Sequence, residues 1–261
     1  METGQPPLSA AKGVDRVLAL LRYLAEHPRG ITLTQLAHDF DSPKTSVHRA
    51  LAALCRAGFA RQDSDNRYHL GLEYVRLAYH HHEAREDYRL VEPALRALAE
   101  HFGETTHYAE LDKAEVIYLA KVTPRGAGIQ MTSTVGGRNP AYCTGVGKAL
   151  LMYAVPTLAA VEEFVHTHGP LRARTPKTLT DAAELADSLA ESRARGYTID
   201  DEESELGIAC LAFPIFLDST REPTGAISIS ALAQRKPVPV LHREAHEARA
   251  IIERSLGPVT S

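Results

Sequence analysis

Apolar residues recur at helical spacing through the first part of the chain. They predict three helices, over residues 12–30, 32–40 and 43–56, each with one apolar face. Residues 59–71, FARQDSDNRYHLG, then read as two short strands on either side of a DSDN turn, as in a β-hairpin. Three helices followed by a hairpin within about 60 residues are typical of a winged helix-turn-helix domain.

The pattern changes after this first module. Residues 72–86 predict a linker helix that contains neither Gly nor Pro. Residues 87–261 mix amphipathic helices with short apolar strands such as GAISISAL, several of them joined by tight turns. The chain is therefore expected to have an α+β fold, with a helix-turn-helix domain at 12–71, an antiparallel-sheet domain at 87–261 and a disordered segment at 1–11.

Charge is distributed unevenly between the two modules. The whole chain has a net charge of -4, which argues against a generally adhesive nucleic-acid binder. Residues 12–71 nevertheless hold nine Lys and Arg against six Asp and Glu, while residues 72–261 hold 20 against 26. A basic module joined to an acidic one is typical of a DNA-binding head on a sensing body, although a difference of this size also arises by chance.

The third predicted helix begins with small polar and basic residues, with Ser42 as the expected N-cap and Pro43 in the first turn. A helix in the major groove reads bases with its N-terminal turns, and its free N–H groups favour a phosphate. An ordinary solvated helix or a protein-binding winged helix is the alternative. The candidate DNA-binding residues, including three on the hairpin, are Ser42, Lys44, Thr45, Ser46, His48, Arg49, Arg61, Arg67 and Tyr68.

The same residues carry a family resemblance. Residues 12–71 resemble the N-terminal domain of the IclR (isocitrate-lyase-regulator) family of bacterial transcription factors. Three later segments, GGRNPAYCTGVGKALL, RARGYTIDDEESELGIACLAFPIF and GAISISAL, resemble successive signatures of that family's effector-binding domain. The resemblance covers roughly residues 12–256. It implies a GAF-like sensing domain, a homodimer or homotetramer, and a palindromic operator whose half-sites lie about 34 Å apart.

The segment CTGVGKAL provides the first wall of an expected effector site. It is not a phosphate-binding P-loop, because Tyr142 stands where that motif needs Gly and Ala149 follows the lysine. Its glycines instead bracket a helix N-terminus, where free N–H groups from Gly145 to Lys148 can hold a carboxylate. A plain turn glycine is an equally good explanation of Gly145 without the family match.

The resemblance implies most of the remaining effector contacts, and Ser228 and Ser230 are added because they alternate along the last predicted strand and can face the same cavity. Asp200 can accept a hydrogen bond from a ligand hydroxyl or amine, whereas Ser228 and Ser230 could equally be structural hydroxyls in a sheet. Asn139 and Tyr142 depart from the commoner family pattern and favour a hydrogen-bonding, aromatic ligand. The candidate effector-binding residues are Met131, Asn139, Gly145, Val146, Asp200, Ile208, Cys210, Ser228 and Ser230.

Other classes of protein find less support. The three cysteines lie far apart, no apolar run of about 20 residues exists, and the N-terminus lacks a secretory signal, so a cytoplasmic protein without a membrane partner is expected. His80, His81 and His82 point in three directions on a helix, and the pair His242 and His246 lacks a third ligand, so no metal or other cofactor is expected.

An enzyme is the rival class. Cys210 or Cys143 with His107 could form a thiol dyad, but neither cysteine lies in a nucleophile motif and no GxSxG is present. A non-enzymatic, ligand-responsive transcriptional regulator is therefore expected. The effector, the operator, repression against activation, and dimer against tetramer remain open.

Overall fold

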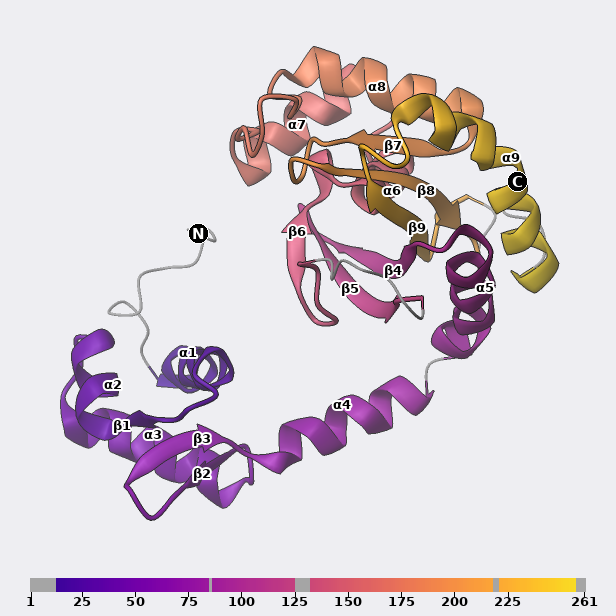
Figure 1. The fold of residues 1–261 in the computed structure, drawn as a ribbon. Coiled ribbons are helices and arrows are strands. Elements are labelled where there is room, and N and C mark those ends of the chain that lie inside the picture. Colours follow the sequence, from indigo (N-terminus) through magenta and orange to yellow (C-terminus); the bar gives the residue numbers. More distant parts are fainter. Residues whose placement is uncertain (1–12, 85, 125–131, 218–220, 257–261) are drawn as a thin grey trace. The chain divides into compact units, whose positions relative to one another are not determined.

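The computed structural model describes residues 13–84, 86–124, 132–217 and 221–256 (Figure 1). The chain divides into two compact units, residues 1–85 and 86–261. The expected disorder at 1–11 and the candidate ligand residue Met131 lie outside the described residues.

The N-terminal unit combines helices with a small antiparallel sheet. Its elements are α1 (Gly13–Glu26), β1 (Ile31–Thr32), α2 (Leu33–Asp39), α3 (Lys44–Arg56), β2 (Ala60–Gln62), β3 (Arg67–Leu70) and α4 (Leu72–Ala84). The sheet order is β1-β3-β2, so the predicted hairpin gains a short third strand. Apolar faces of α1, α2 and α3 meet in one core around Leu20, Leu36 and Leu51. The predicted winged helix-turn-helix is confirmed.

The start of α3 differs from the prediction. The helix begins at Lys44, with Pro43 as its N-cap residue and no side-chain cap. Ser42, which was expected to cap the helix, instead donates its hydroxyl hydrogen to the Phe40 carbonyl at 2.8 Å. Pro43 holds an extended conformation, with φ −55° and ψ 134°, so the chain enters the helix one residue later and Ser42 belongs to the preceding turn.

The C-terminal unit is an antiparallel sheet with helices on both faces. Its elements are α5 (Glu86–Phe102), β4 (Thr105–Asp112), β5 (Glu115–Val122), β6 (Arg138–Pro140), the 3₁₀ turn η2 (Ala141–Cys143), α6 (Gly145–Ala154), α7 (Leu158–His168), α8 (Ala182–Arg195), β7 (Thr198–Asp201), β8 (Ile208–Ile215), β9 (Gly225–Leu232) and α9 (Val238–Leu256). The strand order is β6-β5-β4-β9-β8-β7. The predicted α+β fold is confirmed.

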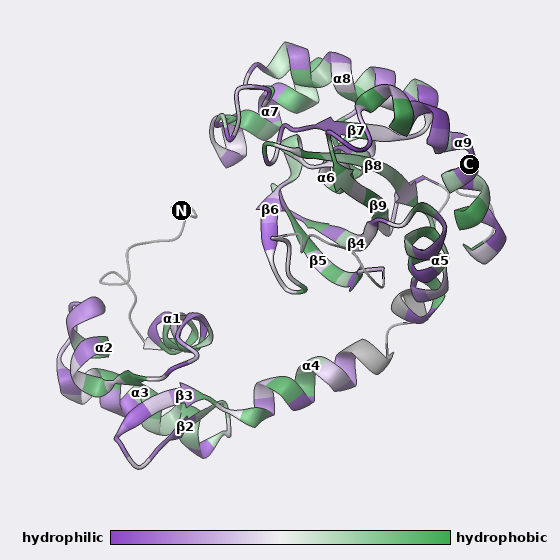
Figure 2. Ribbon diagram, viewed as in Figure 1, coloured by the Kyte–Doolittle hydropathy of each residue, from purple (hydrophilic) through white to green (hydrophobic). Residues whose placement is uncertain are grey.

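Two apolar clusters lie on opposite faces of this sheet. One is formed by α5 and α9 with residues such as Phe213 and Ile227. The other is formed by α6, α7 and α8 with the residues that alternate with them, such as Ala212 and Ala226. Figure 2 shows hydrophobic colour along the strands and on the sides of the helices that face them. Successive residues of each strand therefore pack alternately into the two clusters, as expected for a sheet covered on both sides.

Helix α6 is the most deeply buried helix of the second cluster. Its residues from Gly145 to Met152 are all buried, and Thr144 caps its N-terminus by accepting from the Gly147 N–H at 3.2 Å. Among the described helices, none alone is long and apolar enough to cross a membrane. Helices α6 and α7 meet that criterion only as a pair bent by 115°.

Replacing Leu151 with Ala should destabilise the C-terminal unit by about 2–5 kcal/mol, because the fully buried side chain leaves a cavity in a packed interface. Native-state hydrogen exchange of amides in β8 and β9 measures this opening free energy within the unit itself. Leu158→Ala, at a position 44% exposed at the start of α7, is the matched control and should change that free energy by less than about 1 kcal/mol. Equal effects of the two substitutions would contradict the central place of α6.

Candidate functional site

The exposed face of α3 is polar and basic. Lys44, Thr45, His48 and Arg49 are exposed, whereas the core side of the same helix is formed by the buried residues Val47, Ala50, Leu51 and Leu54. Ser42 and Ser46 are half-buried. Among the described residues, Lys44 and Arg49 form no ion pair. The helix therefore presents unneutralised cations and hydroxyl groups that its own packing does not use.

The N-terminus of α3 also keeps free donors. The Ser46 and Val47 N–H groups bond to the Pro43 carbonyl at 2.9 and 3.2 Å. No described residue accepts from the N–H groups of Lys44 or Thr45, because α3 has no side-chain cap. Uncapped N–H groups at a helix N-terminus bind phosphate well. The displacement of Ser42 thus leaves the N–H groups at the start of α3 available as hydrogen-bond donors.

The wing supplies two arginines. Arg61 on β2 is exposed, and Arg67 on β3 is exposed while its guanidinium donates to the Gly30 carbonyl at 3.3 Å. Asp63 fixes the turn between these strands by accepting from the Arg67 N–H at 2.9 Å and contacting the His69 ring at 2.6 Å. Both arginines are thus carried on a braced hairpin.

Tyr68 must be removed from the candidate DNA contacts. Its side chain is only 5% exposed and packs in the core of the N-terminal unit. Burial raises its pKa, as expected for a phenol withdrawn from water. The strand alternates inward and outward residues, so Arg67 faces solvent and Tyr68 faces the core. The aromatic residue was assigned to the wrong face of the hairpin.

A cavity of about 50 Å³ lies in the C-terminal unit, beside the N-terminus of α6. Eight of the nine predicted effector-binding residues line it, and the ninth, Met131, lies outside the described residues. The eight are Asn139, Gly145, Val146, Asp200, Ile208, Cys210, Ser228 and Ser230. The volume is well below the roughly 300–1,000 Å³ of a pocket for a drug-sized ligand, so the cavity as it stands has room only for a small molecule.

Other lining residues were not among the predicted effector contacts, although His107 was considered as the partner of a cysteine in a thiol dyad. They are His107, Tyr118, Thr132, Ser133, Thr144, Ser204 and Glu205. His107 pairs directly with Ser228 across β4 and β9, so knowledge of the strand pairing would have identified it. A single sequence shows which strands exist but not which strands are neighbours.

His107 is the centre of a buried hydroxyl cluster. Its Nε2 atom lies 2.7 Å from Ser133 Oγ, and its Nδ1 atom lies 3.4 Å from Ser230 Oγ. Burial, helped by the nearby Lys121 charge, lowers the pKa of His107 to about 3. The imidazole is therefore neutral and can both donate and accept a hydrogen bond.

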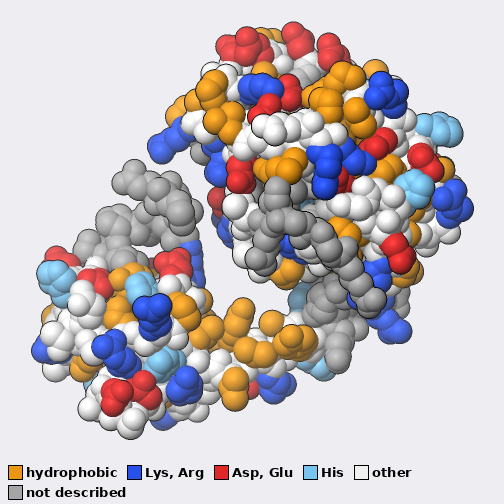
Figure 3. Space-filling model, viewed as in Figure 1, with side chains coloured by type: hydrophobic (Ala, Val, Ile, Leu, Met, Phe, Trp, Pro, Cys, Tyr) orange, Lys and Arg blue, Asp and Glu red, His pale blue; other side chains and the backbone are white. Residues whose placement is uncertain are grey.

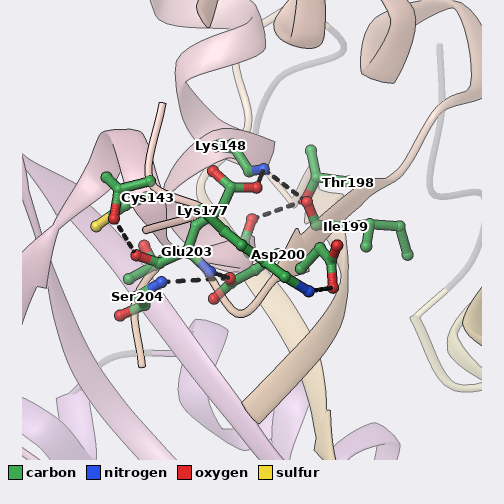
Figure 4. Close-up of polar contacts among 12 residues, drawn as sticks. Cys143, Lys148, Lys177, Thr198, Ile199, Asp200, Glu203 and Ser204 are labelled. Carbon is green, nitrogen blue, oxygen red and sulfur yellow. Dashed lines mark hydrogen bonds and ion pairs between the residues drawn. The ribbon is translucent and has the colours of Figure 1, made fainter. Parts of the chain in front are cut away.

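Asp200 is the buried acid of the cavity. It is 2% exposed, and its Oδ1 atom accepts from the Glu203 and Ser204 N–H groups at 2.8 and 3.4 Å (Figure 4). Burial raises the pKa of Asp200 to about 7, against the opposing effect of Lys148 and with a contribution from the Glu203 carboxylate. Asp200 therefore exchanges a proton near neutral pH and can donate to a ligand as well as accept from it.

The glycines at the start of α6 are required by close packing rather than by access of a ligand to the backbone. A Cβ atom on Gly145 would lie 3.0 Å from Cys210 Cβ, and one on Gly147 would lie 2.2 Å from the Ala141 carbonyl oxygen. The expected row of four free N–H groups is shorter than predicted. Gly147 donates to Thr144 Oγ1, and Lys148 donates to the Thr144 carbonyl. Among the described residues, only the Gly145 and Val146 N–H groups of this turn remain without an acceptor.

Tyr142 has a different role from the one expected. It is not among the residues that line the cavity. Its hydroxyl donates to the Arg172 carbonyl at 2.7 Å and accepts from the Arg172 N–H at 3.0 Å. The phenol therefore anchors a neighbouring loop, and the aromatic character of the ligand loses this part of its support.

The part of the chain that the structure describes holds no group of three or more His, Cys, Asp and Glu that could bind a metal ion. The thiol dyad is also poorly placed within it. Cys210 donates to Ser230 Oγ at 3.2 Å, and burial raises the pKa of its thiol. With a neutral His107 nearby, these groups do not supply the thiolate that nucleophilic catalysis requires.

A winged helix-turn-helix joined to a separate domain with a buried polar cavity defines the protein as a DNA-binding transcriptional regulator. Comparison with known families agrees. Residues 13–64 match the IclR helix-turn-helix domain, and residues 83–250 match the model described as bacterial transcriptional regulator IclR C-terminal. The chain belongs to the IclR family of transcriptional regulators.

Individual relatives match along most of the chain. It is 35% identical to the transcriptional repressor IclR of Escherichia coli K12, over 88% of this chain and 83% of that one. A crystal structure of a regulator from Alicyclobacillus acidocaldarius matches with a TM-score of 0.76 at 27% identity, over 97% and 98% of the two chains. A homologue from Microbacterium hydrocarbonoxydans, crystallised with 4-hydroxybenzoate, matches in fold with a TM-score of 0.73 at 24% identity, over 92% and 98%.

The substitution Asp200→Asn should change how stability depends on pH. A raised pKa means that folded Asp200 holds its proton more strongly than unfolded Asp200, so wild-type stability falls as pH rises from about 4 to about 7. Asparagine cannot ionise, so the stability of the variant should not fall in this way. Relative to the wild type, its free energy of unfolding should rise across this window by a few kcal/mol, at about 1.4 kcal/mol per pKa unit. Hydrogen-exchange opening energies of β8 at several pH values measure the difference. A difference independent of pH would show that folding does not raise the pKa of Asp200.

Proposed function

We propose that this protein is a ligand-responsive repressor that binds a palindromic operator as a dimer, or as a tetramer of paired dimers. The α3 helices contact the DNA, and a small organic effector occupies the cavity beside α6. The observation that carries this function is the coexistence of an uncapped, cationic recognition helix and a polar cavity in one chain. The repressor named among the relatives supports the direction of regulation.

Exposed apolar side chains support self-association. Leu72, Val75 and Tyr79 lie on one side of α4 and are exposed, as are Val14 and Leu18 on α1. Figure 3 shows hydrophobic side chains gathered along α4. Apolar patches of this kind mark interaction surfaces in soluble proteins. A second copy is the natural occupant, because a two-fold symmetric protein matches a palindromic operator.

The DNA contacts follow from the exposed face of α3. Lys44 and the free N–H groups at the start of the helix suit phosphate, while His48 and Arg49, on the following turn, can reach base edges. Arg61 and Arg67 on the wing suit the flanking backbone. Ser42, Thr45 and Ser46 add hydroxyl groups at the helix entrance.

The cavity favours a small ligand with hydrogen-bonding groups. Its described lining offers a neutral imidazole, a phenol, an amide and several hydroxyls, but no Lys or Arg. A carboxylate ligand would therefore depend on the Gly145 and Val146 N–H groups and on a protonated Asp200. The fold accommodates an aromatic acid in the homologue that carries 4-hydroxybenzoate, which makes such acids the first probes.

Coupling between the sites requires that the effector prefer one arrangement of the protein. Such a preference typically supplies about 1–3 kcal/mol. Helix α4, which lies immediately before the C-terminal unit in the chain, is the element that would transmit it. A regulator of this kind acts where the chromosome lies, so we place it in the cytoplasm.

Lys44→Ala and Arg49→Ala should weaken DNA binding in different ways. Loss of a phosphate contact by Lys44 should lower the slope of log affinity against log salt by about 0.9. Loss of a base contact by Arg49 should cost about 1–3 kcal/mol and relax preference at one position. Fluorescence anisotropy with a duplex selected from a random library measures both. Arg56→Ala, at the C-terminal end of the same helix, is the control and should bind as the wild type does.

The selected duplexes also test the dimer. They should share two symmetric half-sites about 10 base pairs apart, centre to centre. A winged helix that binds protein instead would enrich no sequence at all, and a single unrepeated half-site would exclude the proposed two-fold arrangement.

Effector binding should raise the melting temperature of the full-length protein. A ligand at about 100 times its dissociation constant stabilises by about 2.7 kcal/mol, which corresponds to several degrees. Screening small carboxylic and aromatic acids by thermal shift should give a hit that Asp200→Ala abolishes and Lys44→Ala preserves. A screen without hits, or a hit indifferent to Asp200, would remove the cavity from the proposed function.

A further inference from the structure

A buried ion pair lies behind the cavity. Lys148, on the first turns of α6, is only 2% exposed, and its ammonium group donates to a carboxylate oxygen of Glu203. It also donates to the Ile199 carbonyl at 2.6 Å. Neither residue of the pair lines the cavity. Figure 4 shows Lys148, Asp200 and Glu203 gathered in one polar cluster.

Stability alone does not explain why this pair exists. Removing two charges from water is costly, and exchanging a buried ion pair for apolar side chains of similar size is often neutral or stabilising. A buried pair is therefore better understood by what its directed contacts hold in place.

Lys148 contacts residues that lie before and after Asp200 in the sequence. Lys148 bonds to the carbonyl of the residue before Asp200 and to the side chain of Glu203 after it. The Glu203 N–H in turn donates to Asp200 Oδ1 at 2.8 Å. Among the residues that the structure describes, the second carboxylate oxygen of buried Glu203 has no hydrogen-bond partner, so Lys148 is the anchor of this side chain.

Lys148 is also part of α6, and the first residues of that helix form the cavity wall opposite Asp200. Lys148 follows Gly145 and Val146 on the same helical turn. These two residues line the cavity, and their N–H groups are the ones in that turn for which no described residue is an acceptor. One side chain thus connects the N-terminal turn of α6 with the segment that carries Asp200.

We propose that Lys148 is a positioning residue that holds the Asp200 segment against the N-terminal turn of α6, so that the two walls of the cavity keep a fixed spacing and move together. The role in effector recognition rests on the function proposed above. The spacing itself is a property of the ligand-free protein. An effector that contacts both walls then meets a preformed site, and a shift of the Asp200 segment is passed to α6.

A second lysine provides a matched comparison. Lys177 bonds to Asp201 and Glu202 of the same segment at 3.1 and 2.6 Å, but its side chain is 45% exposed. Exposed ion pairs contribute little to holding a structure in place. Lys177→Met therefore makes the same chemical change on the solvent side of the segment.

The test is the double variant Lys148→Met with Glu203→Met in the full-length protein, followed by hydrogen exchange without any ligand. Because both charges are removed, the protein should keep a melting temperature close to that of the wild type. Exchange of the amides at positions 203 and 204, after correction for intrinsic rates, should accelerate about tenfold or more, while amides in β8 and β9 keep their protection. Lys177→Met should leave all of these rates unchanged.

Two outcomes would overturn the proposal. Unchanged exchange at positions 203 and 204 in the folded double variant would show that other contacts, such as the hydrogen bond from Thr178 to the Glu203 carbonyl, hold the segment. Parallel acceleration in β8 and β9, or failure to fold, would show that the pair supports the whole unit. Neither result depends on an effector, so the proposed function is tested separately by the ligand screen.

Discussion

The close approach of α6 to the sheet is the constraint on which the cavity depends. Gly145 lies so near β7 and β8 that a methyl group there would contact Cys210, and the buried face of the helix continues this contact to Met152. A residue with a side chain at 145 would require the facing strands or the helix to shift by a few tenths of an ångström. The burial that stabilises the C-terminal unit therefore also sets the dimensions of its polar site.

The fold was largely accessible from the sequence, because helical and alternating apolar patterns report directly on burial. The candidate site was partly accessible. Six family-matched residues and the two serines of the last strand meet at one cavity, whereas placing His107 there required strand pairing that no local pattern contains. Tyr68 was assigned to the wrong face of the hairpin, and Tyr142, expected in or beside the pocket, does not line the cavity. An aromatic residue with a hydroxyl suits a core, a loop anchor or a ligand contact equally well, and only tertiary packing distinguishes these roles.

The two units place their polar groups in opposite ways. The N-terminal unit buries one side of α1, α2 and α3. Within the described residues, it leaves cations, hydroxyls and N–H groups without partners on the outside of α3. The C-terminal unit does the opposite. It encloses an acid, an imidazole and hydroxyls, which form hydrogen bonds with one another and with the backbone. Unpaired cations and polar groups on a surface suit DNA, which is a highly charged polymer. Enclosed polar groups suit a small ligand that the protein can surround.

The separation of roles along α3 has an evolutionary consequence. Val47, Leu51 and Leu54 maintain the core, while His48 and Arg49 take no part in it. Substitutions at the outward positions leave folding intact, so descendants of a duplicated ancestral gene are free to drift toward new target sites. The fold therefore tolerates a change of DNA target with little loss of stability.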